Sequence, residues 1–159
     1  MELTYKLEDH GSFDRISLSG NINEDAEVVL EQMQSSVTKD TVFNFGGVKM
    51  VNSCGVRAWI NFLREVSGNK KLVFEECTPE IVGQINMIPN FRGEAEVRSV
   101  YADFACENCD HSEWKLFKEG ENLPTNPEDF EAEKYKCPSC GDTLEMEELE
   151  EEFFAFLAS

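Results

Sequence analysis

Four cysteines stand in two pairs that share the same internal spacing. Cys106 and Cys109 form the first CxxC pair, Cys137 and Cys140 form the second, and 27 residues separate the pairs. A CxxC turn lets two thiolates converge on one ion, so two such turns supply the four ligands of a tetrahedral zinc site. We therefore predict that these four cysteines bind one zinc ion. A catalytic zinc keeps one coordination position open, so four cysteine ligands indicate a structural role.

The residues that follow each pair bear on the geometry of its turn. Gly141 follows the second pair, at a position that commonly requires a positive φ, which glycine adopts without strain. Asp110 holds the same position after the first pair, and we expect it to adopt the left-handed conformation there. His111 is the one further metal-binding side chain beside the pairs, and we expect it to be a surface residue.

The cell compartment decides whether the cysteines stay reduced. The N-terminus lacks the charged and apolar pattern of a secretory signal, and no stretch reaches the ~18 consecutive apolar residues of a membrane span. We therefore expect a cytoplasmic protein that does not bind membranes. Thiols stay reduced there, so the six cysteines favour metal binding over disulfides. We expect Cys77 in the core, and Cys54 either as a small packed residue or as a redox-sensitive thiol.

Negative charge is concentrated in the cysteine-rich part of the chain. The net charge is −18, of which residues 1–102 contribute −5 (15 acidic, 10 basic) and residues 103–159 contribute −13 (17 acidic, 4 basic). Such a surface repels phosphate backbones and anionic lipids, so we do not expect nucleic acid as a partner. The acidity serves either solvation or an acidic docking surface.

The first hundred residues alternate between two hydrophobic periods. Near-alternate apolar positions in residues 1–7 and 13–19, with a polar connection between them, predict a hairpin. Further segments follow in the order helix 23–37, strand 41–48, helix 53–68, strand 71–74, helix 78–89 and strand 95–104. A hairpin followed by alternating strands and helices predicts an α/β fold with a mixed sheet and packed helices. We expect this domain to span residues 1–102 and a small zinc ribbon module to span residues 103–159.

The expected helices carry start signals. Asn23 is a good N-cap followed by acidic residues, Ser53 precedes the second apolar stripe, and Thr78 with Pro79 opens the third helix. We therefore predict that Asn23, Ser53 and Thr78 are N-caps. The glycines at 46 and 47 are expected to bound the third strand, and Pro89 to close the third helix.

Two stretches resemble one known family. Residues 16–22, which end the second strand with Gly20 before Asn21 and Ile22, and residues 42–56, which run from a strand into Asn52-Ser53-Cys54-Gly55, resemble the STAS domain of anti-sigma factor antagonists. The resemblance covers residues 1–102. It implies a bacterial signalling module without catalytic activity that binds a protein partner, such as an anti-sigma factor or a kinase-like regulator.

The chain departs from the family at the residues of the phosphorylation switch. In the antagonists, the hydroxyl residue directly before the motif glycine is phosphorylated, and that position is Cys54 here. Two acidic positions of the family are the amides Asn44 and Asn52. We therefore expect no phosphorylation switch at this position, with the hydroxyl of Ser53 engaged as a helix cap.

The resemblance also implies where the partner binds. The family meets its partner at the edge where this motif begins a helix, with free helix-terminal amides and a glycine that allows close approach. The residues that we expect on this face are Asn21, Asn23, Asn52, Ser53, Cys54, Gly55 and Arg57.

The C-terminal tail, residues 145–159, has its own amphipathic pattern. Leu149, Phe153, Phe156 and Leu157 fall at helical spacing among glutamates. This apolar face is expected to dock onto the rest of the chain, or else to anchor a partner or a second copy of the chain in a homo-oligomer.

Two classes of function follow from the sequence. The favoured one is a regulatory, non-enzymatic protein, because the chain has only two histidines, in polar contexts, and no phosphate-binding loop or nucleophile motif. The alternative is a redox protein or sensor that uses the CxxC pairs or Cys54.

Overall fold

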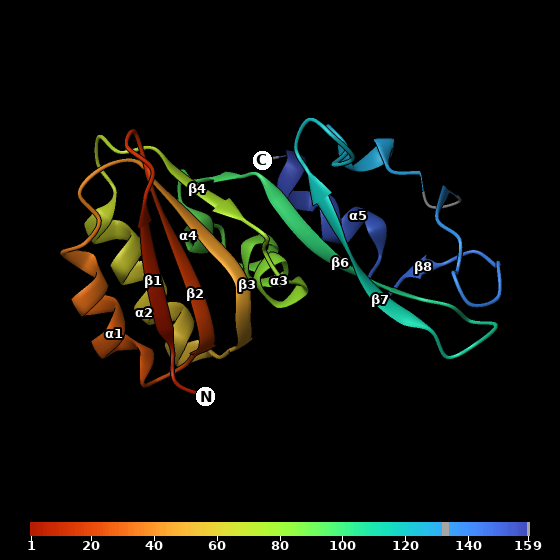
Figure 1. Cartoon of the computed structure of the whole chain (residues 1–159), viewed down its shortest axis with the longest axis horizontal. Helices are drawn as coiled ribbons and strands as arrows, with labels where there is room; N and C mark the ends of the chain where they lie inside the picture. The colour runs from red at the N-terminus through yellow and green to blue at the C-terminus, as the bar shows by residue number, and fades with distance from the viewer. Residues whose placement is uncertain (132–133, 159) are drawn as a thin grey trace.

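A five-stranded sheet, here called sheet A, holds the first part of the chain in the computed structural model, which describes residues 1–131 and 134–158 (Figure 1). Its strands lie in the order β1-β2-β3-β4-β5, with the β1–β2 pair antiparallel and the other pairs parallel. Their bounds are β1 Thr4–Asp9, β2 Asp14–Ile22, β3 Thr41–Val51, β4 Leu72–Glu75 and β5 Glu96–Val97. The mixed sheet and its opening hairpin confirm the expected α/β fold class.

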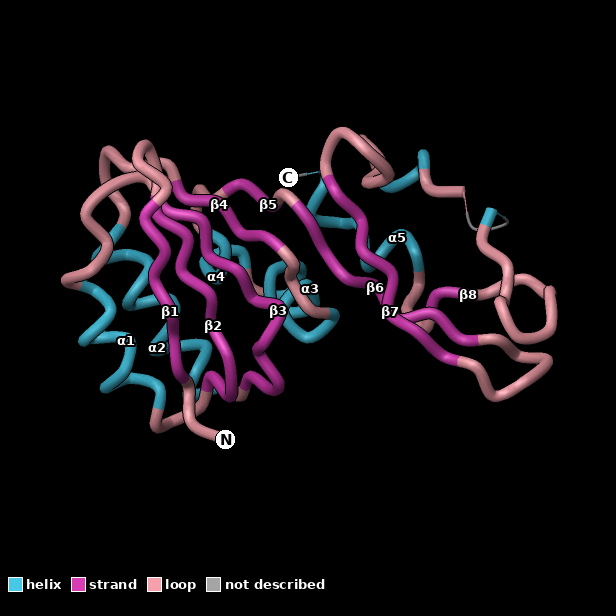
Figure 2. The backbone as a smooth tube through the Cα atoms, viewed as in Figure 1, coloured by secondary structure: helices cyan, strands magenta, loops and turns pink. Residues whose placement is uncertain are grey.

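A smaller antiparallel sheet, here called sheet B, holds the cysteine-rich part (Figure 2). Its order is β7-β6-β8, so the long β6–β7 hairpin pairs at its end with a short third strand. The bounds are β6 Ser99–Ala105, β7 Ser112–Lys118 and β8 Glu145–Met146, and the 3-10 helix η1 spans Pro127–Asp129. The expected strand 95–104 is therefore two strands, β5 in sheet A and β6 in sheet B.

The helices lie behind the sheets in the view of Figure 1, with α3 between sheet A and sheet B. Their bounds are α1 Ala26–Gln34, α2 Ser53–Val66, α3 Pro79–Met87, α4 Pro89–Arg92, α5 Glu150–Phe153 and the 3-10 helix η3 Phe154–Ala158. Pro89 therefore begins a short helix rather than only closing the third one. No helix in the described ranges has the length and apolar content to cross a membrane.

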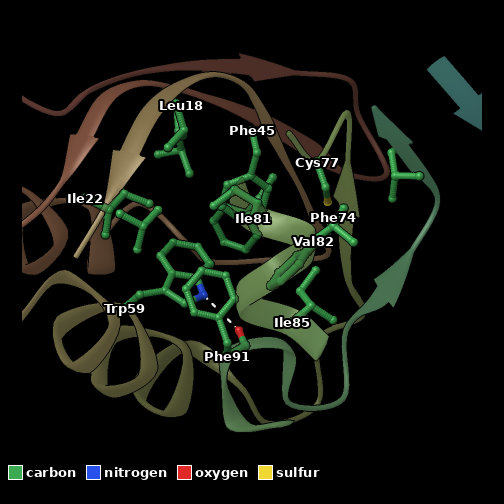
Figure 3. Close-up of a cluster of buried hydrophobic side chains, with 14 of the residues drawn as sticks. Leu18, Ile22, Phe45, Trp59, Phe74, Cys77, Ile81, Val82, Ile85 and Phe91 are labelled. Carbon is green, nitrogen blue, oxygen red and sulfur yellow. Dashed lines mark hydrogen bonds between the residues drawn. The ribbon is translucent and has the colours of Figure 1, made fainter. Parts of the chain in front are cut away.

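Trp59 on α2 is the centre of the sheet A core (Figure 3). Its side chain is fully buried, and its indole N–H donates to the Phe91 carbonyl oxygen at 3.0 Å, so the buried polar atom is satisfied. The rings packed around it within 6 Å, centroid to centroid, belong to Phe43, Phe45, Phe62, Phe74 and Phe91. α2 is thereby fixed against β3, β4 and α4.

We expected strand β3 to end at its glycines, Gly46 and Gly47. It continues to Val51 instead. The register against β2 shifts between Ser17 and Ser19, because Ser17 pairs with Asn44 whereas Ser19 pairs with Gly47. One strand has an extra residue there, which is the geometry of a β-bulge, a common place for glycine. The pairing with β2 therefore carries the strand past a local stop signal.

The start of α2 is pressed against the end of β2. Asn52, rather than Ser53, is the N-cap, and its Oδ1 accepts a hydrogen bond from the Gly55 N–H at 2.9 Å. A Cβ atom on Gly55 would collide with the Ile22 carbonyl oxygen. Only glycine allows the backbones at Ile22 and Gly55 to come this close. The contact places the loop after β2 beside the start of α2.

The sequence predicted the N-cap of α3 correctly and the N-cap of α1 incorrectly. Thr78 caps α3 as predicted, because its Oγ1 accepts from the Ile81 N–H at 3.3 Å. Asn23 is not the N-cap of α1, which begins at Ala26. Its side chain accepts from the Asp25 N–H at 3.0 Å in the preceding turn instead.

Sheets A and B are joined by backbone hydrogen bonds. Beyond β4, Cys77 forms a parallel bridge with Val100 of β6, in which the Cys77 N–H donates to the Ser99 carbonyl at 3.1 Å and the Tyr101 N–H donates to the Cys77 carbonyl at 2.7 Å. Cys77 is fully buried, as predicted. The hydrophobic core is continuous from Leu3 to Phe156, so it crosses the boundary that we expected at residue 102.

The C-terminal tail docks onto α3 and α4. Phe153, Phe154 and Phe156 are buried, and the Asn86 side-chain amide donates to the carbonyls of Glu152 and Phe153, each at 2.9 Å. Arg92 donates to the Phe156 carbonyl at 3.0 Å. The phenylalanines thus pack within the chain, which is the first of the alternatives that the sequence left open. Leu149 differs, since it is 69% exposed.

Replacing Gly55 with alanine should destabilise the fold by about 1–3 kcal/mol, because the added methyl group forces α2 away from β2. Gly83, inside α3, is the matched control. A Cβ there has no neighbour within 4 Å, and Gly83→Ala should stabilise by about 0.5–1 kcal/mol by removing helix-interior glycine. Urea unfolding measures both. Equal stability of the two variants would contradict the close contact.

Candidate metal centre and partner-binding face

The four cysteines of the two CxxC pairs converge on one point. The Sγ atoms of Cys106, Cys109, Cys137 and Cys140 all lie within 4.8 Å of one another. The Cys106–Cys140 separation is 3.4 Å and the Cys109–Cys137 separation is 3.6 Å. A Zn–S bond of ~2.3 Å in a tetrahedron corresponds to sulfurs about 3.8 Å apart. The donor set and its spacing therefore fit a tetrahedral metal ion.

Two turns bring the sulfurs together. The first follows β6, where the Cys106 N–H donates to the His111 carbonyl at 2.9 Å and closes the loop between β6 and β7. In the second turn, the Gly141 N–H donates to the Cys137 carbonyl at 2.9 Å, with Gly141 at the predicted positive φ of 83°. The expectation for Asp110 is wrong, since Glu76 is the only non-glycine residue with positive φ in the described ranges.

The cysteines differ in their surroundings. Cys106 and Cys137 are buried and belong to the hydrophobic core, whereas Cys140 is exposed. Hydrogen bonding from the backbone of Asp142 lowers the pKa of Cys140 to about 7, whereas burial raises the pKa of Cys106. A bound metal ion would stabilise all four thiolates, which otherwise repel one another at these distances.

His111 lies outside this cluster. Among the residues that the structure describes, only the four cysteine sulfurs gather closely enough to share one metal ion. The Nε2 atom of His111 lies 2.9 Å from Glu113 Oε1, and this contact lowers the pKa of the Glu113 carboxyl. His111 is half-buried and engaged with this carboxylate.

An aromatic layer packs beneath the cysteine cluster. Phe104, Phe117 and Tyr135 meet one another with ring centroids 5.3–6.1 Å apart. Phe154 of the tail lies 5.7 Å from Phe117, centroid to centroid. Sheet B, the loop that carries the second cysteine pair and the tail therefore share one set of packed rings, which the sequence pattern did not predict.

The residues expected on the partner face lie around the joined ends of β2, β3 and α2. Asn21 and Ile22 pair with Met50 and Val51, so the two loops that follow β2 and β3 leave the same edge of sheet A. The side chain of Asn52 links these loops, because its Nδ2 donates to Glu24 Oε2 at 2.8 Å while its Oδ1 caps α2. This amide also lowers the pKa of the Glu24 carboxyl.

Three side chains of this face are open to solvent. Ser53, Cys54 and Arg57 are exposed on the first turn and a half of α2, whereas Asn21, Asn23 and Asn52 are half-buried and Gly55 is buried. We expected the Ser53 hydroxyl to cap the helix amides. Asn52 is the cap instead, so this expectation is wrong. The absence of a phosphorylation switch at this position stays a prediction.

Asn44 has a role that the sequence did not reveal. Its Nδ2 donates to Glu75 Oε2 at 2.8 Å and to Glu76 Oε2 at 2.9 Å, and its Oδ1 accepts from the Gly46 N–H. Glu75 also pairs with Arg15 at 2.8 Å. An aspartate at 44 would face two carboxylates, so the amide is required by charge.

The comparisons with known proteins agree with this architecture. No family model and no curated protein matches the chain. The anti-sigma factor antagonist SpoIIAA in its unphosphorylated form is 15% identical, with a TM-score of 0.46 over 55% of this chain and 83% of that chain. An anti-sigma factor antagonist from Mycobacterium paratuberculosis is also 15% identical, with a TM-score of 0.50 over 60% of this chain and 85% of that chain. The second likeness shows that the part of the chain it covers has the fold of an anti-sigma factor antagonist.

Proposed function

We propose that this chain is a regulatory, non-enzymatic protein that binds a protein partner through the start of α2 and holds one structural zinc ion with Cys106, Cys109, Cys137 and Cys140. The observation that carries the first part is the exposed start of α2, held rigidly by Asn52 and Gly55, in the fold of an anti-sigma factor antagonist. The partner class that fits this fold is an anti-sigma factor or a kinase-like regulator.

The partner face combines features that suit protein recognition. Cys54 is small and exposed, so a partner side chain can approach the start of α2 closely at this position. Arg57, one turn further, is an exposed cation on a negatively charged chain and suits an anchor for an acidic group of the partner. The half-buried amides of Asn21 and Asn23 border this surface.

The proposal of a structural metal rests on the donor chemistry. Four cysteines complete a tetrahedral shell and leave no position for substrate. Sulfur contacts join the two pairs, because Cys106 Sγ lies 3.4 Å from Cys140 Sγ and Cys109 Sγ lies 3.6 Å from Cys137 Sγ. This arrangement suits one ion shared by both turns better than a redox disulfide inside one turn. In this proposal, residues 1–102 are the partner-binding part and residues 103–159 the metal-binding part of a chain with one continuous core.

The metal content tests this site. Chain purified without chelator should contain about one zinc ion per molecule by elemental analysis, the value of a four-thiolate site. Cys137→Ser should lose the ion and loosen sheet B, because Cys137 is a ligand in the core. Cys54→Ser, which removes an exposed cysteine outside the cluster, should keep the full zinc content. A metal-free chain with folded sheet B would disprove the structural metal.

The reactivity of the thiols separates the metal protein from the redox alternative. With a thiol reagent, Cys54 should react at once because it is exposed, and Cys77 only after unfolding because it is fully buried. The four cluster cysteines should react slowly until a chelator is added, since zinc holds them as ligands. Rapid reaction of the cluster without chelator, followed by disulfide formation on oxidation, would favour the redox protein.

A bulky side chain at position 54 should block partner binding. Cys54→Trp should weaken the complex with the native partner at least about thirtyfold, the effect of losing a central interface contact. The thermal midpoint should stay within a few degrees, because Cys54 is exposed. Met87→Trp, at a 70% exposed position on α3, is the control and should leave binding unchanged. Undiminished binding by Cys54→Trp would refute this face.

A further inference from the structure

A groove of about 650 Å³ lies between β8 and α5, at the end of the molecule that carries sheet B. Met146 and Leu149 contribute apolar surface to it. Leu149 is 69% exposed, although the phenylalanines that follow it in the tail are buried. The groove therefore keeps an apolar contact open to solvent that the tail does not use for its own docking. Its volume lies within the range of about 300–1,000 Å³ that is found for ligand-binding sites in proteins.

The border of this groove is acidic throughout. Five of the described residues that line it are glutamates, among them Glu148 and Glu151, and none is basic. None of these five forms an ion pair with another described residue. Lys136 is at the edge of the groove, where its Nζ donates to Thr143 Oγ1 at 3.2 Å.

The carboxylates here are crowded by charge of the same sign from other elements. Burial raises the pKa of Glu148, and so do Asp103 on β6 and Glu80 on α3. The five glutamate carboxylates around the apolar contact repel one another. A cation placed among them would reduce this repulsion and form ion pairs. Solubility alone does not require the charges to surround an exposed leucine.

We propose that this groove binds a basic segment of a protein partner, whose lysine or arginine side chains pair with the glutamate border and whose apolar side chain packs on Leu149 and Met146. Apolar contact at the centre with charges around it is the usual arrangement of a protein interface. A lone metal cation would leave the leucine uncovered, and phosphate-rich partners are repelled by the net charge of −13 in residues 103–159.

This groove is separate from the partner face. The start of α2 lies beside sheet A, whereas β8 is a strand of sheet B and α5 lies next to that sheet, on the other side of α3 in the view of Figure 1. The chain would thus join two proteins, one at each end, and the inference does not depend on the identity of the first partner.

The probe for this groove is a synthetic peptide of fourteen residues with leucine and lysine at helical spacing, titrated into the zinc-loaded full chain by calorimetry at low salt. Binding should weaken with added salt, because the border charges are exposed. A peptide with glutamate in place of lysine should not bind. Leu149→Asp should reduce the affinity at least about tenfold, through loss of the apolar contact.

Charge at the groove is tested with matched double variants. Glu148→Gln with Glu151→Gln should reduce the affinity about threefold to tenfold, the range for exposed charge pairs. Glu119→Gln with Glu121→Gln removes the same charge at exposed positions beyond β7 and should change nothing. Amide shifts caused by the peptide should map to Met146 and Leu149, and Cys54→Trp should leave peptide affinity unchanged.

Three results would overturn the inference. The first is that the lysine peptide does not bind the native chain. The second is that both double variants lose the same affinity, which would show attraction by net charge alone. The third is that Leu149→Asp binds like the native chain while amide shifts lie away from the groove.

Discussion

Cys77 joins sheet A to sheet B, and the placement of α3, β6 and the tail follows from this junction. Strand β4 ends two residues before it at Glu75, Cys77 pairs with Val100 of β6, and α3 begins at Pro79. α3 then packs Ile81, Val82 and Ile85 into the core that both sheets share (Figure 3). The fully buried Cys77 thiol, whose pKa burial raises, is a packing group and has no access to solvent chemistry. A polar or larger side chain there would separate the sheets.

This junction explains how a metal site can matter far from the partner face. The four clustered cysteines join the turn after β6 to the loop before β8, and the aromatic rings of Phe104, Phe117 and Tyr135 pack against the tail. The tail in turn reaches α3 through Asn86. A change at the cysteines therefore reaches the sheet A core through packed side chains and hydrogen bonds, so the two proposed binding surfaces would be held at fixed separation.

The sequence predicted what local pattern determines and missed what tertiary contacts decide. The CxxC spacing predicted that four cysteines converge, and hydrophobic periods predicted the mixed sheet, because both are short-range signals. Asn52 and Ser53 are both good caps, and the contact of Asn52 with the distant Glu24 is not visible in sequence. β3 passes its glycines because β2 pairs with it. The exposure of Leu149, next to phenylalanines that are buried, depends on how the tail packs on α3 and is not visible in sequence either.

Native-state hydrogen exchange of the zinc-loaded chain tests most directly whether this junction makes one unit of the two sheets. If it does, the slowest amides of β3 in sheet A and of β6 in sheet B should exchange with the same free energy of opening, within about 1 kcal/mol, because they open only when the whole chain unfolds. Amides of β6 that exchange with a free energy several kcal/mol lower than those of β3 would show that sheet B opens by itself. The junction at Cys77 would then not couple the two sheets.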